Sequence, residues 1–330
     1  MRLRRFFSTV RILQHDNPLG LPKSGTPPTF KSRRGLPQKR RIRDVQKVVA
    51  VSSAKGGVGK STIAVNLALA LARRGIRTGI LDTDIFGPSI PTLLNLHGEP
   101  RLDSNNCLIP LTNYGLKSMS MGYLLPQASS SSSSSSDTEL TTSSPPPMDT
   151  TPISWRGLMV TKAMQQLLHS VSWGPLDILI LDLPPGTGDV QLTIGQEIIL
   201  DGAVIVSTPQ DIALRDAVRG FGMFQKMDVP VLGMVQNMAF FACPNCGHET
   251  KIFSHSHSHA HDAEGGVVAQ CQRLGIEFLG DIPLDARVCE DADRGMPTVV
   301  AEEGDPNSVR RKAFMSIAEK VVRGVGMDWL

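Results

Sequence analysis

A glycine-rich run, Ala54-Lys55-Gly56-Gly57-Val58-Gly59-Lys60-Ser61-Thr62, has the residue types of a phosphate-binding loop. Glycines let the backbone wrap around phosphate oxygens with its N–H groups pointing inward, and a helix that begins there adds the positive end of its dipole. We expect Lys60 to reach the β- and γ-phosphates and the Ser61 hydroxyl to ligate Mg²⁺. The strict pattern begins with glycine where this chain has Ala54, which is small enough to fit. A glycine-rich turn without a ligand is the alternative, but a strand, this loop and a helix in that order favour a nucleotide site lined by Gly56, Gly57, Val58, Gly59, Lys60, Ser61 and Thr62.

Carboxylates follow two apolar runs that read as strands. Asp182 ends the run at residues 179–182, where an acid that holds Mg²⁺ through water is expected, and the loop at 184–189 would lie near the γ-phosphate. Asp82 and Asp84 follow a second run and could touch Mg²⁺ or orient the attacking water. Either cluster alone could be an ordinary cap of a strand end. Beside a phosphate loop they predict a nucleotide hydrolase, because phosphoryl transfer needs positioning and charge neutralisation.

Two of the five cysteines, Cys243 and Cys246, are spaced so that both thiols can point at one centre. Outside a disulfide framework, such a pair is typical of a metal-binding or redox-active site. The scattered Cys107, Cys271 and Cys289 are interpreted as structural thiols.

Short apolar runs alternate with helical patterns from about residue 44 onward. The predicted strands are 48–51, 78–81, 178–181, 203–206, 231–235 and 278–279, and the predicted helices include 62–74, 159–170, 192–200 and 214–226. Strands that are apolar at every position and separated by helices indicate an α/β fold, a mostly parallel sheet with helices on both faces. We expect one domain over residues 44–330.

Two inserts interrupt this pattern. Residues 128–151 include eight consecutive serines at 129–136 and are expected to be a disordered surface loop, because they bury little apolar surface. Residues 254–262 contain four histidines that alternate with Ser or Ala. This tract could bind metal, but a tolerated loop insertion is the preferred interpretation.

Charge separates the first 43 residues from the rest of the chain. They hold twelve Lys/Arg and one acid, a net charge of +11, whereas the remainder holds 22 basic and 30 acidic residues, a net charge of −8. The acidic remainder argues against a nucleic-acid partner. Residues 1–15 are Arg-rich, acid-free and amphipathic, which predicts a mitochondrial transit peptide followed by a basic linker, and hence the mitochondrial matrix; a disordered basic tail is the alternative. The absence of 18 uninterrupted apolar residues excludes an integral membrane segment.

The phosphate loop resembles the deviant Walker A motif of the MinD/Mrp class of SIMIBI-like P-loop NTPases, with the signature lysine of that class at Lys55. Further motifs occur in the same order in the Mrp/Nbp-type iron–sulfur carrier ATPases: Asp82-Thr83-Asp84-Ile85-Phe86-Gly87-Pro88-Ser89, Trp155-Arg156-Gly157, Asp182-Leu183-Pro184-Pro185-Gly186-Thr187-Gly188-Asp189, Gln236-Asn237-Met238 and Cys243-Pro244-Asn245-Cys246. The resemblance covers about residue 45 to the C-terminus. Together with the leader, it points to the mitochondrial branch that assists assembly of respiratory complex I.

The resemblance implies a role for each matching residue. Lys55 would contact the nucleotide of a partner subunit, Lys60 the phosphates of its own, and Asp84 would position the hydrolytic water. Asp182 would lie in the second shell of Mg²⁺. Asn237 would recognise adenine with its paired donor and acceptor. The two inserts depart from the family pattern.

The resemblance also implies a weak ATPase that binds ATP, Mg²⁺ and a transient [4Fe–4S] cluster and delivers the cluster to apo iron–sulfur proteins, complex I subunits among them. Such a cluster needs about four thiolates, so Cys243 and Cys246 would be completed by their copies in a homodimer. Two alternatives remain. A zinc-binding P-loop ATPase would use the same thiolates, because Cys-Pro-x-Cys-Gly is also a zinc-knuckle turn. A MinD/ParA-like positioning ATPase would bind membrane through the apolar stripe of the last helix, at Phe314, Ile317, Val321 and Val325, although packing of this helix on the sheet is the preferred interpretation of the stripe.

Overall fold

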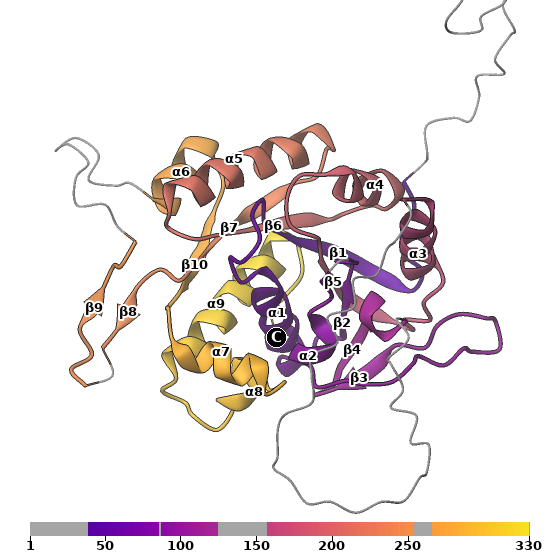
Figure 1. Ribbon diagram of the computed structural model, residues 1–330, viewed down its shortest axis with the longest axis horizontal. Helices are drawn as coiled ribbons and strands as arrows, with labels where there is room; N and C mark the ends of the chain where they lie inside the picture. The colour runs from indigo at the N-terminus through magenta and orange to yellow at the C-terminus, as the bar shows by residue number, and fades with distance from the viewer. Residues whose placement is uncertain (1–38, 86, 125–156, 244, 254–265, 330) are drawn as a thin grey trace, which may run out of the picture. The chain divides into compact units, whose positions relative to one another are not determined.

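Eight strands form one sheet within the part of the chain that the computed structural model describes, which is residues 39–85, 87–124, 157–243, 245–253 and 266–329 (Figure 1). Their order across the sheet is β10-β7-β6-β1-β5-β2-β4-β3. The strands are β1 Val45–Ser52, β2 Thr78–Asp82, β3 Leu111–Asn113, β4 Leu116–Ser120, β5 Leu176–Asp182, β6 Gly202–Ser207, β7 Val231–Asn237 and β10 Phe278–Ile282. Neighbouring strands are parallel except for the β3–β4 pair. The predicted mostly parallel sheet is confirmed.

Helices cover both faces of this sheet, as the sequence predicted (Figure 1). One face packs against α3 Gly157–His169, α4 Asp189–Glu197, α5 Asp211–Lys226 and α6 Val267–Leu274. The other packs against α1 Lys60–Arg73, α2 Ile90–Leu93, α7 Ala286–Asp293, α8 Thr298–Ala301 and α9 Val309–Gly324. Alternate residues of β1 enter the two layers, Val48 and Ala50 on one side and Val49 and Val51 on the other. This explains why the central strands are apolar at nearly every position.

The carboxyl ends of the parallel strands meet at one edge of the sheet and bring the predicted polar residues together. Asp82 and Asp182 are directly opposite one another in the pairing of β2 with β5, and Val51 pairs with Asp182 just before the glycine-rich loop. Asn237 ends β7 at the same edge. Ligands of open α/β sheets bind outside this edge, which is where the site is expected.

A segment before β1 belongs to the same compact unit, which spans Lys39–Leu330. Arg40 N donates to Glu197 O at 2.9 Å and Ile199 N donates to Arg40 O at 3.0 Å, while the Ile42 side chain is buried. Lys39 Nζ donates to Met227 O at 2.7 Å, at the end of α5, where a cation interacts favourably with the helix dipole. The predicted boundary between residues 43 and 44 therefore falls inside this packed segment.

The stripe on the last helix is part of the core. Phe314, Ile317, Val321 and Val322 of α9 are fully buried, in the layer that contains α1. The interpretation of this stripe as a membrane-binding face is therefore wrong. Among the described residues, no helix combines the length and apolarity needed to span a bilayer.

Several predictions concern residues outside the described part of the chain. These are the transit peptide over residues 1–15, the Ser-rich insert at 128–151, the His-rich insert at 254–262, and Trp155 and Arg156 of one motif.

Candidate functional site

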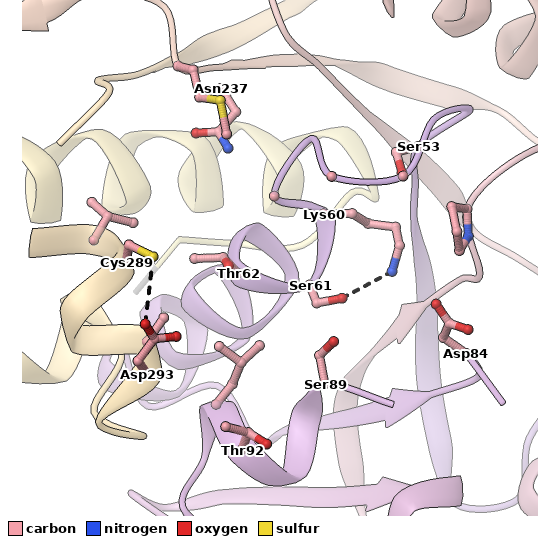
Figure 2. A pocket seen from close by; sticks show the side chains of 18 of the residues that line it. Ser53, Lys60, Ser61, Thr62, Asp84, Ser89, Thr92, Asn237, Cys289 and Asp293 are labelled. Carbon is pink, nitrogen blue, oxygen red and sulfur yellow. Dashed lines mark hydrogen bonds between the residues drawn. The ribbon is translucent and has the colours of Figure 1, made fainter. Parts of the chain in front are cut away.

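A cavity of about 610 Å³ lies at the carboxyl edge of the sheet (Figure 2). Six predicted residues of the glycine-rich loop and its helix line it: Gly56, Gly57, Gly59, Lys60, Ser61 and Thr62. Asp84 and Asn237 line it as well. In Figure 2, Lys60, Ser61, Asp84 and Ser89 gather on one side of the cavity, and Asn237, Cys289 and Asp293 lie on the other. The cavity therefore has one side with the residues predicted to bind phosphate and an opposite side with room for a base.

The glycines shape the loop for a close-lying ligand. Gly57 and Gly59 have φ angles of 78° and 82°, in the left-handed region, and Gly59 is the N-cap of α1. A Cβ added at Gly59 would lie 2.3 Å from Asn237 Nδ2, whereas one at Gly56 or Gly57 would meet no atom within 4 Å. Only glycine fits at Gly59, and the open space over Gly56 and Gly57 is where phosphate oxygens can approach.

Lys60 forms a buried ion pair with Asp182. Its Nζ lies 2.5 Å from Asp182 Oδ1. The same Nζ lies 3.2 Å from Ser61 Oγ (Figure 2). Asp182 is completely buried, and desolvation raises its pKa, while Lys60 opposes that shift. Asp182 Oδ2 has no hydrogen-bond partner. The loop lysine is thus held at the phosphate side of the cavity by an acid that keeps one oxygen available.

The residues around Ser61 fit a magnesium ion. The Ser61 hydroxyl lines the cavity, and the Asp182 carboxylate with its unpartnered oxygen lies behind it. Hydroxyl and carboxylate oxygens are the ligands that this hard cation prefers, with water filling the remaining positions. Ser61 would bind the ion directly and Asp182 through water, as predicted from the sequence.

Asp82 and Asp84 have different roles although only one residue separates them. Asp82 is fully buried, and its oxygens accept hydrogen bonds from Asp84 N at 3.0 Å, Ile90 N at 3.3 Å and Ser120 Oγ at 3.0 Å. Desolvation, and secondarily repulsion from Asp182, raise the pKa of Asp82 to about 7. Asp82 therefore fastens both ends of the loop after β2, and Asp84 is the carboxylate at the cavity wall.

Lys55 lies outside its own cavity. Its side chain is exposed, and the Ser53 hydroxyl donates to Lys55 O at 3.0 Å, which fixes the backbone at this point. The cavity lining includes Ser53 and Gly56 but not Lys55. The predicted contact of Lys55 with a partner's nucleotide stays a prediction, and an outward-facing side chain is compatible with it.

Asn237 braces the glycine-rich loop. Its Nδ2 donates to Val58 O at 2.9 Å, and Val58 itself is buried behind the loop. Met238, the next residue, also lines the cavity and has a φ of 56°. Adenine recognition by Asn237 stays a prediction, with the side chain at the wall where the base would lie.

Cys243 and Cys246 lie on a small hairpin that follows β7, between β8 Phe241–Ala242 and β9 Glu249–Thr250. Cys243 N donates to His248 O at 3.0 Å and Gly247 N donates to Cys243 O at 2.8 Å, which closes a tight turn around the pair. Backbone N–H groups of Cys246 and Asn245 lower the pKa of the Cys243 thiol. A stabilised thiolate is the form that binds metal. Within the described residues, no group of three or more Cys, His, Asp or Glu could hold a metal ion, and the predicted role of the pair as cluster ligands stays a prediction.

Part of the cavity wall has no sequence motif. It comprises Pro283, Leu284 and Asp285 after β10, and Val288, Cys289, Ala292 and Asp293 of α7. The signal that could have found the first three is the end of strand 278–279, since parallel strands end at the same edge. Cys289, interpreted as a structural thiol, is exposed at the cavity wall, which the sequence did not predict, whereas Cys271 is buried.

Comparisons with known proteins agree with this geometry. A family model, ParA, described as NUBPL iron-transfer P-loop NTPase, matches residues 44–132 and 141–322. The chain is 48% identical over 292 residues to the mouse "Iron-sulfur cluster transfer protein NUBPL", covering 88% of this chain and 81% of that protein. It is 41% identical over 286 residues to an Arabidopsis thaliana "Iron-sulfur protein required for NADH dehydrogenase, mitochondrial", covering 86% of this chain and 80% of that one.

Solved structures share the fold. A nucleotide-binding protein from Archaeoglobus fulgidus in complex with ADP superposes with a TM-score of 0.62 at 34% identity, covering 81% of this chain and 92% of its own. MinD from Pyrococcus horikoshii, complexed with Mg-ADP, has a TM-score of 0.55 at 17% identity, covering 85% and 98%, which supports the fold alone. The resemblance inferred from the motifs is confirmed.

Proposed function

Because this chain belongs to the family of NUBPL iron-transfer P-loop NTPases, we propose that it is an ATP-dependent iron–sulfur cluster carrier of the mitochondrion. It would bind a transient [4Fe–4S] cluster between two copies of the chain and deliver it to apoproteins, complex I subunits among them. The observation that carries the proposal is that β7, whose last residue Asn237 lines the nucleotide cavity, leads directly into the cysteine hairpin of β8 and β9.

ATP binding and slow hydrolysis are assigned to the phosphate side of the cavity. Lys60 would leave Asp182 Oδ1 for the phosphates, and Ser61 and Asp182 would hold Mg²⁺, which supplies charge neutralisation when bound. Asp84 would orient the attacking water. Because Asp82 fixes both ends of the loop that carries Asp84, this carboxylate has a defined place before the nucleotide arrives.

The cluster is the cargo, and the cysteine pair is half of its site. Two thiolates per chain leave two positions of a [4Fe–4S] cluster to a second copy. Phe241 and Ile252, which flank the hairpin, are 38% and 52% exposed, as apolar residues of an uncovered subunit interface would be. Cysteines at such a seam would release the cluster when the two copies separate.

Nucleotide binding and cluster binding would be coupled through residues 238–240, which connect β7 to the cysteine hairpin. Ala239 N donates to Ile282 O at 3.0 Å and Leu284 N donates to Phe240 O at 2.8 Å, so the chain leading to Cys243 is bonded to the end of β10 and to the residues just after it. Met238 and Leu284 both line the cavity. A nucleotide that moves these residues would move the hairpin with them.

The destination follows from the leader and the relatives. The Arg-rich, acid-free residues 1–15 and the mitochondrial relative from Arabidopsis support the mitochondrion, and we place the chain in the matrix.

Anaerobic reconstitution with iron and sulfide tests the proposal. We expect wild-type protein to bind about four iron and four sulfide per dimer, with the broad visible absorbance of a cluster, and Cys243→Ala to bind neither. Cys107→Ala, at a half-buried thiol away from the hairpin, is the matched control. Zinc without sulfide in the wild type would favour the zinc-binding alternative, and full iron content in a monomer would refute the shared site.

A further inference from the structure

A second cavity, of about 380 Å³, lies between the two loops that follow β2 and β5. Its lining comprises Thr83, Asp84 and Ile85 of the first loop, Pro184, Pro185 and Gly188 of the second, and Val190 and Gln191 of α4. Asp84 and Pro185 also line the nucleotide cavity, so the two cavities meet at these residues. The second cavity therefore adjoins the side of the nucleotide cavity where Lys60 and Ser61 lie.

Gln191 brings an unpaired polar atom to this cavity. Its side chain is 1% exposed, and its Nε2 donates to Pro184 O at 2.5 Å. A carbonyl oxygen only accepts, so this bond fixes which end of the amide is which. The other end, Oε1, is buried without a hydrogen-bond partner. Such an unsatisfied acceptor calls for a donor that is absent from the protein itself.

Water is the donor that fits the cavity. Ile85, Pro184, Pro185 and Val190 make most of its wall apolar, and Asp84 contributes a carboxylate. A water between Gln191 Oε1 and Asp84 would donate one hydrogen to each acceptor, and both of its lone pairs would then remain free. A water held in this way is oriented as a nucleophile.

We propose that Gln191 and Asp84 together hold the water that attacks the γ-phosphate. This inference rests on the proposed ATP hydrolysis and assigns its nucleophile. The water oxygen forms a bond to the γ-phosphorus while the bond from that phosphorus to the β–γ bridging oxygen breaks, and ADP keeps the electron pair of the broken bond. One O–H stays on the hydrogen phosphate formed, and the second proton passes to Asp84 and on to solvent. Through its hydrogen bond to Pro184 O, Gln191 also links α4 to the loop after β5. The same side chain would therefore position both the water and this loop.

Two substitutions separate the water-holding role from a purely structural one. Gln191→Leu removes both polar atoms, and Gln191→Glu keeps an acceptor oxygen but removes the N–H donor to Pro184 O. Gln165→Leu is the matched control, because Gln165 is an exposed residue of α3 whose Nε2 contacts Glu197 Oε1. The measurements are ATP turnover, ADP affinity from a fluorescent analogue, and the gain in ADP affinity produced by aluminium fluoride, which mimics the transferring phosphoryl group.

We expect Gln191→Leu to lower kcat about 100-fold, the scale of losing one group that acts on the nucleophile. ADP affinity should change less than about threefold and the aluminium fluoride gain should disappear. Gln191→Glu should exceed Gln191→Leu in kcat by about tenfold, because the acceptor is retained. A structural role predicts instead that both variants lose ADP affinity together with turnover, and that result would overturn the assignment. Equal turnover in Gln191→Leu and wild type would overturn it too, leaving the proposed function intact, whereas a wild type that binds ADP but leaves ATP intact would refute both.

Discussion

Three buried charged side chains meet where β2 and β5 end. Asp82 and Asp182 are paired across the two strands, and Lys60 is the cation that touches Asp182. When two carboxylates and one ammonium group are buried together, desolvation and mutual repulsion make it unfavourable for both carboxylates to be ionised. The pKa of Asp82, raised to about 7, expresses that conflict in the protein without nucleotide.

Asp82→Asn should change how stability depends on pH. Between about pH 4 and pH 7 the folded wild type holds a proton on Asp82 that the unfolded chain has released, so folding takes up a proton. The free energy of unfolding must then fall as the pH rises, by at most about 1.4 kcal/mol per pH unit from this group. We expect the free energy of unfolding of the wild type, minus that of Asp82→Asn, to fall from pH 5 to pH 7 and to level off at higher pH. Urea unfolding in EDTA without nucleotide measures it.

The control for this titration is Asp103→Asn. Asp103 is half-buried, and a hydrogen bond from the Cys107 backbone N–H lowers its pKa, so its titration lies below the measured range. Curves for Asp82→Asn that run parallel to the wild type from pH 5 to pH 8 would contradict the raised pKa.

Cys289 offers a direct test of the cavity. Its exposed thiol lies on the wall opposite Lys60, so bound nucleotide should cover it (Figure 2). With ADP at about 100 times its Kd the empty fraction is about 1%, and alkylation of Cys289 should slow accordingly. Peptide mass spectrometry gives the rate at each thiol. Cys107 should be indifferent to ADP, and the buried Cys271, whose pKa is raised to about 11 by desolvation, should react slowly throughout. Equal labelling of Cys289 with and without ADP would place the nucleotide elsewhere.

The short segment between β7 and β8 connects the nucleotide cavity to the cysteine hairpin and would carry the proposed coupling. It contains Met238, a non-glycine residue in the left-handed region with a φ of 56°. Such a conformation costs roughly 1–3 kcal/mol and persists where surrounding contacts enforce it. Here the enforcing contacts are the bond of Ala239 to Ile282 at the end of β10 and the bond of Phe240 to Leu284, which follows it. The strained residue is thus placed between the cavity and the hairpin.

Met238→Gly should weaken the coupling without weakening the fold. Glycine adopts this φ freely, so the link would gain freedom while its hydrogen bonds remain. In wild type we expect ATP to slow alkylation of Cys243, because the closed dimer covers the pair; in Met238→Gly this protection should largely disappear. Asn106→Gly is the matched control, since Asn106 has a φ of 59° in a loop away from the cavity. Unchanged protection in Met238→Gly would show that coupling runs by another route.

The sequence predicted those elements whose residue pattern lies within one short segment of the chain. The central strands were found because both of their faces are buried, and the glycine-rich loop because phosphate binding demands its residue types. The antiparallel β3–β4 pair was not found, because β3 has three residues of intermediate or full exposure and no apolar pattern. Sequence spacing also could not decide between Asp82 and Asp84 as the cavity carboxylate, or bring Cys289 to the cavity wall, since both depend on how distant segments pack.

Symmetry is the feature of the whole molecule on which the proposed function depends. In the proposed function one chain would contribute two cysteines to the cluster, and its exposed Lys55 is not part of the lining of its own nucleotide cavity. A second copy would supply the two missing thiolates and a lysine for each nucleotide. If a two-fold axis relates the copies, each must supply the other with the same groups.

Mixing two inactive variants tests this exchange. Lys60→Ala should lose nucleotide binding, whereas Lys55→Ala should keep it within about threefold, because Lys55 lies outside the cavity, and should lose turnover. In a mixed dimer, the Lys55→Ala copy binds ATP and its partner supplies the missing lysine. Equal mixing produces about half mixed dimers with one working site each, so turnover should recover to about a quarter of the wild-type value. Lys60→Arg serves as a second variant that keeps a cation beside Asp182, in case Lys60→Ala leaves that buried carboxylate unpaired and unfolds. Each variant mixed only with itself is the control, and a mixture with no more than the mean of those two activities would mean that Lys55 acts within its own chain.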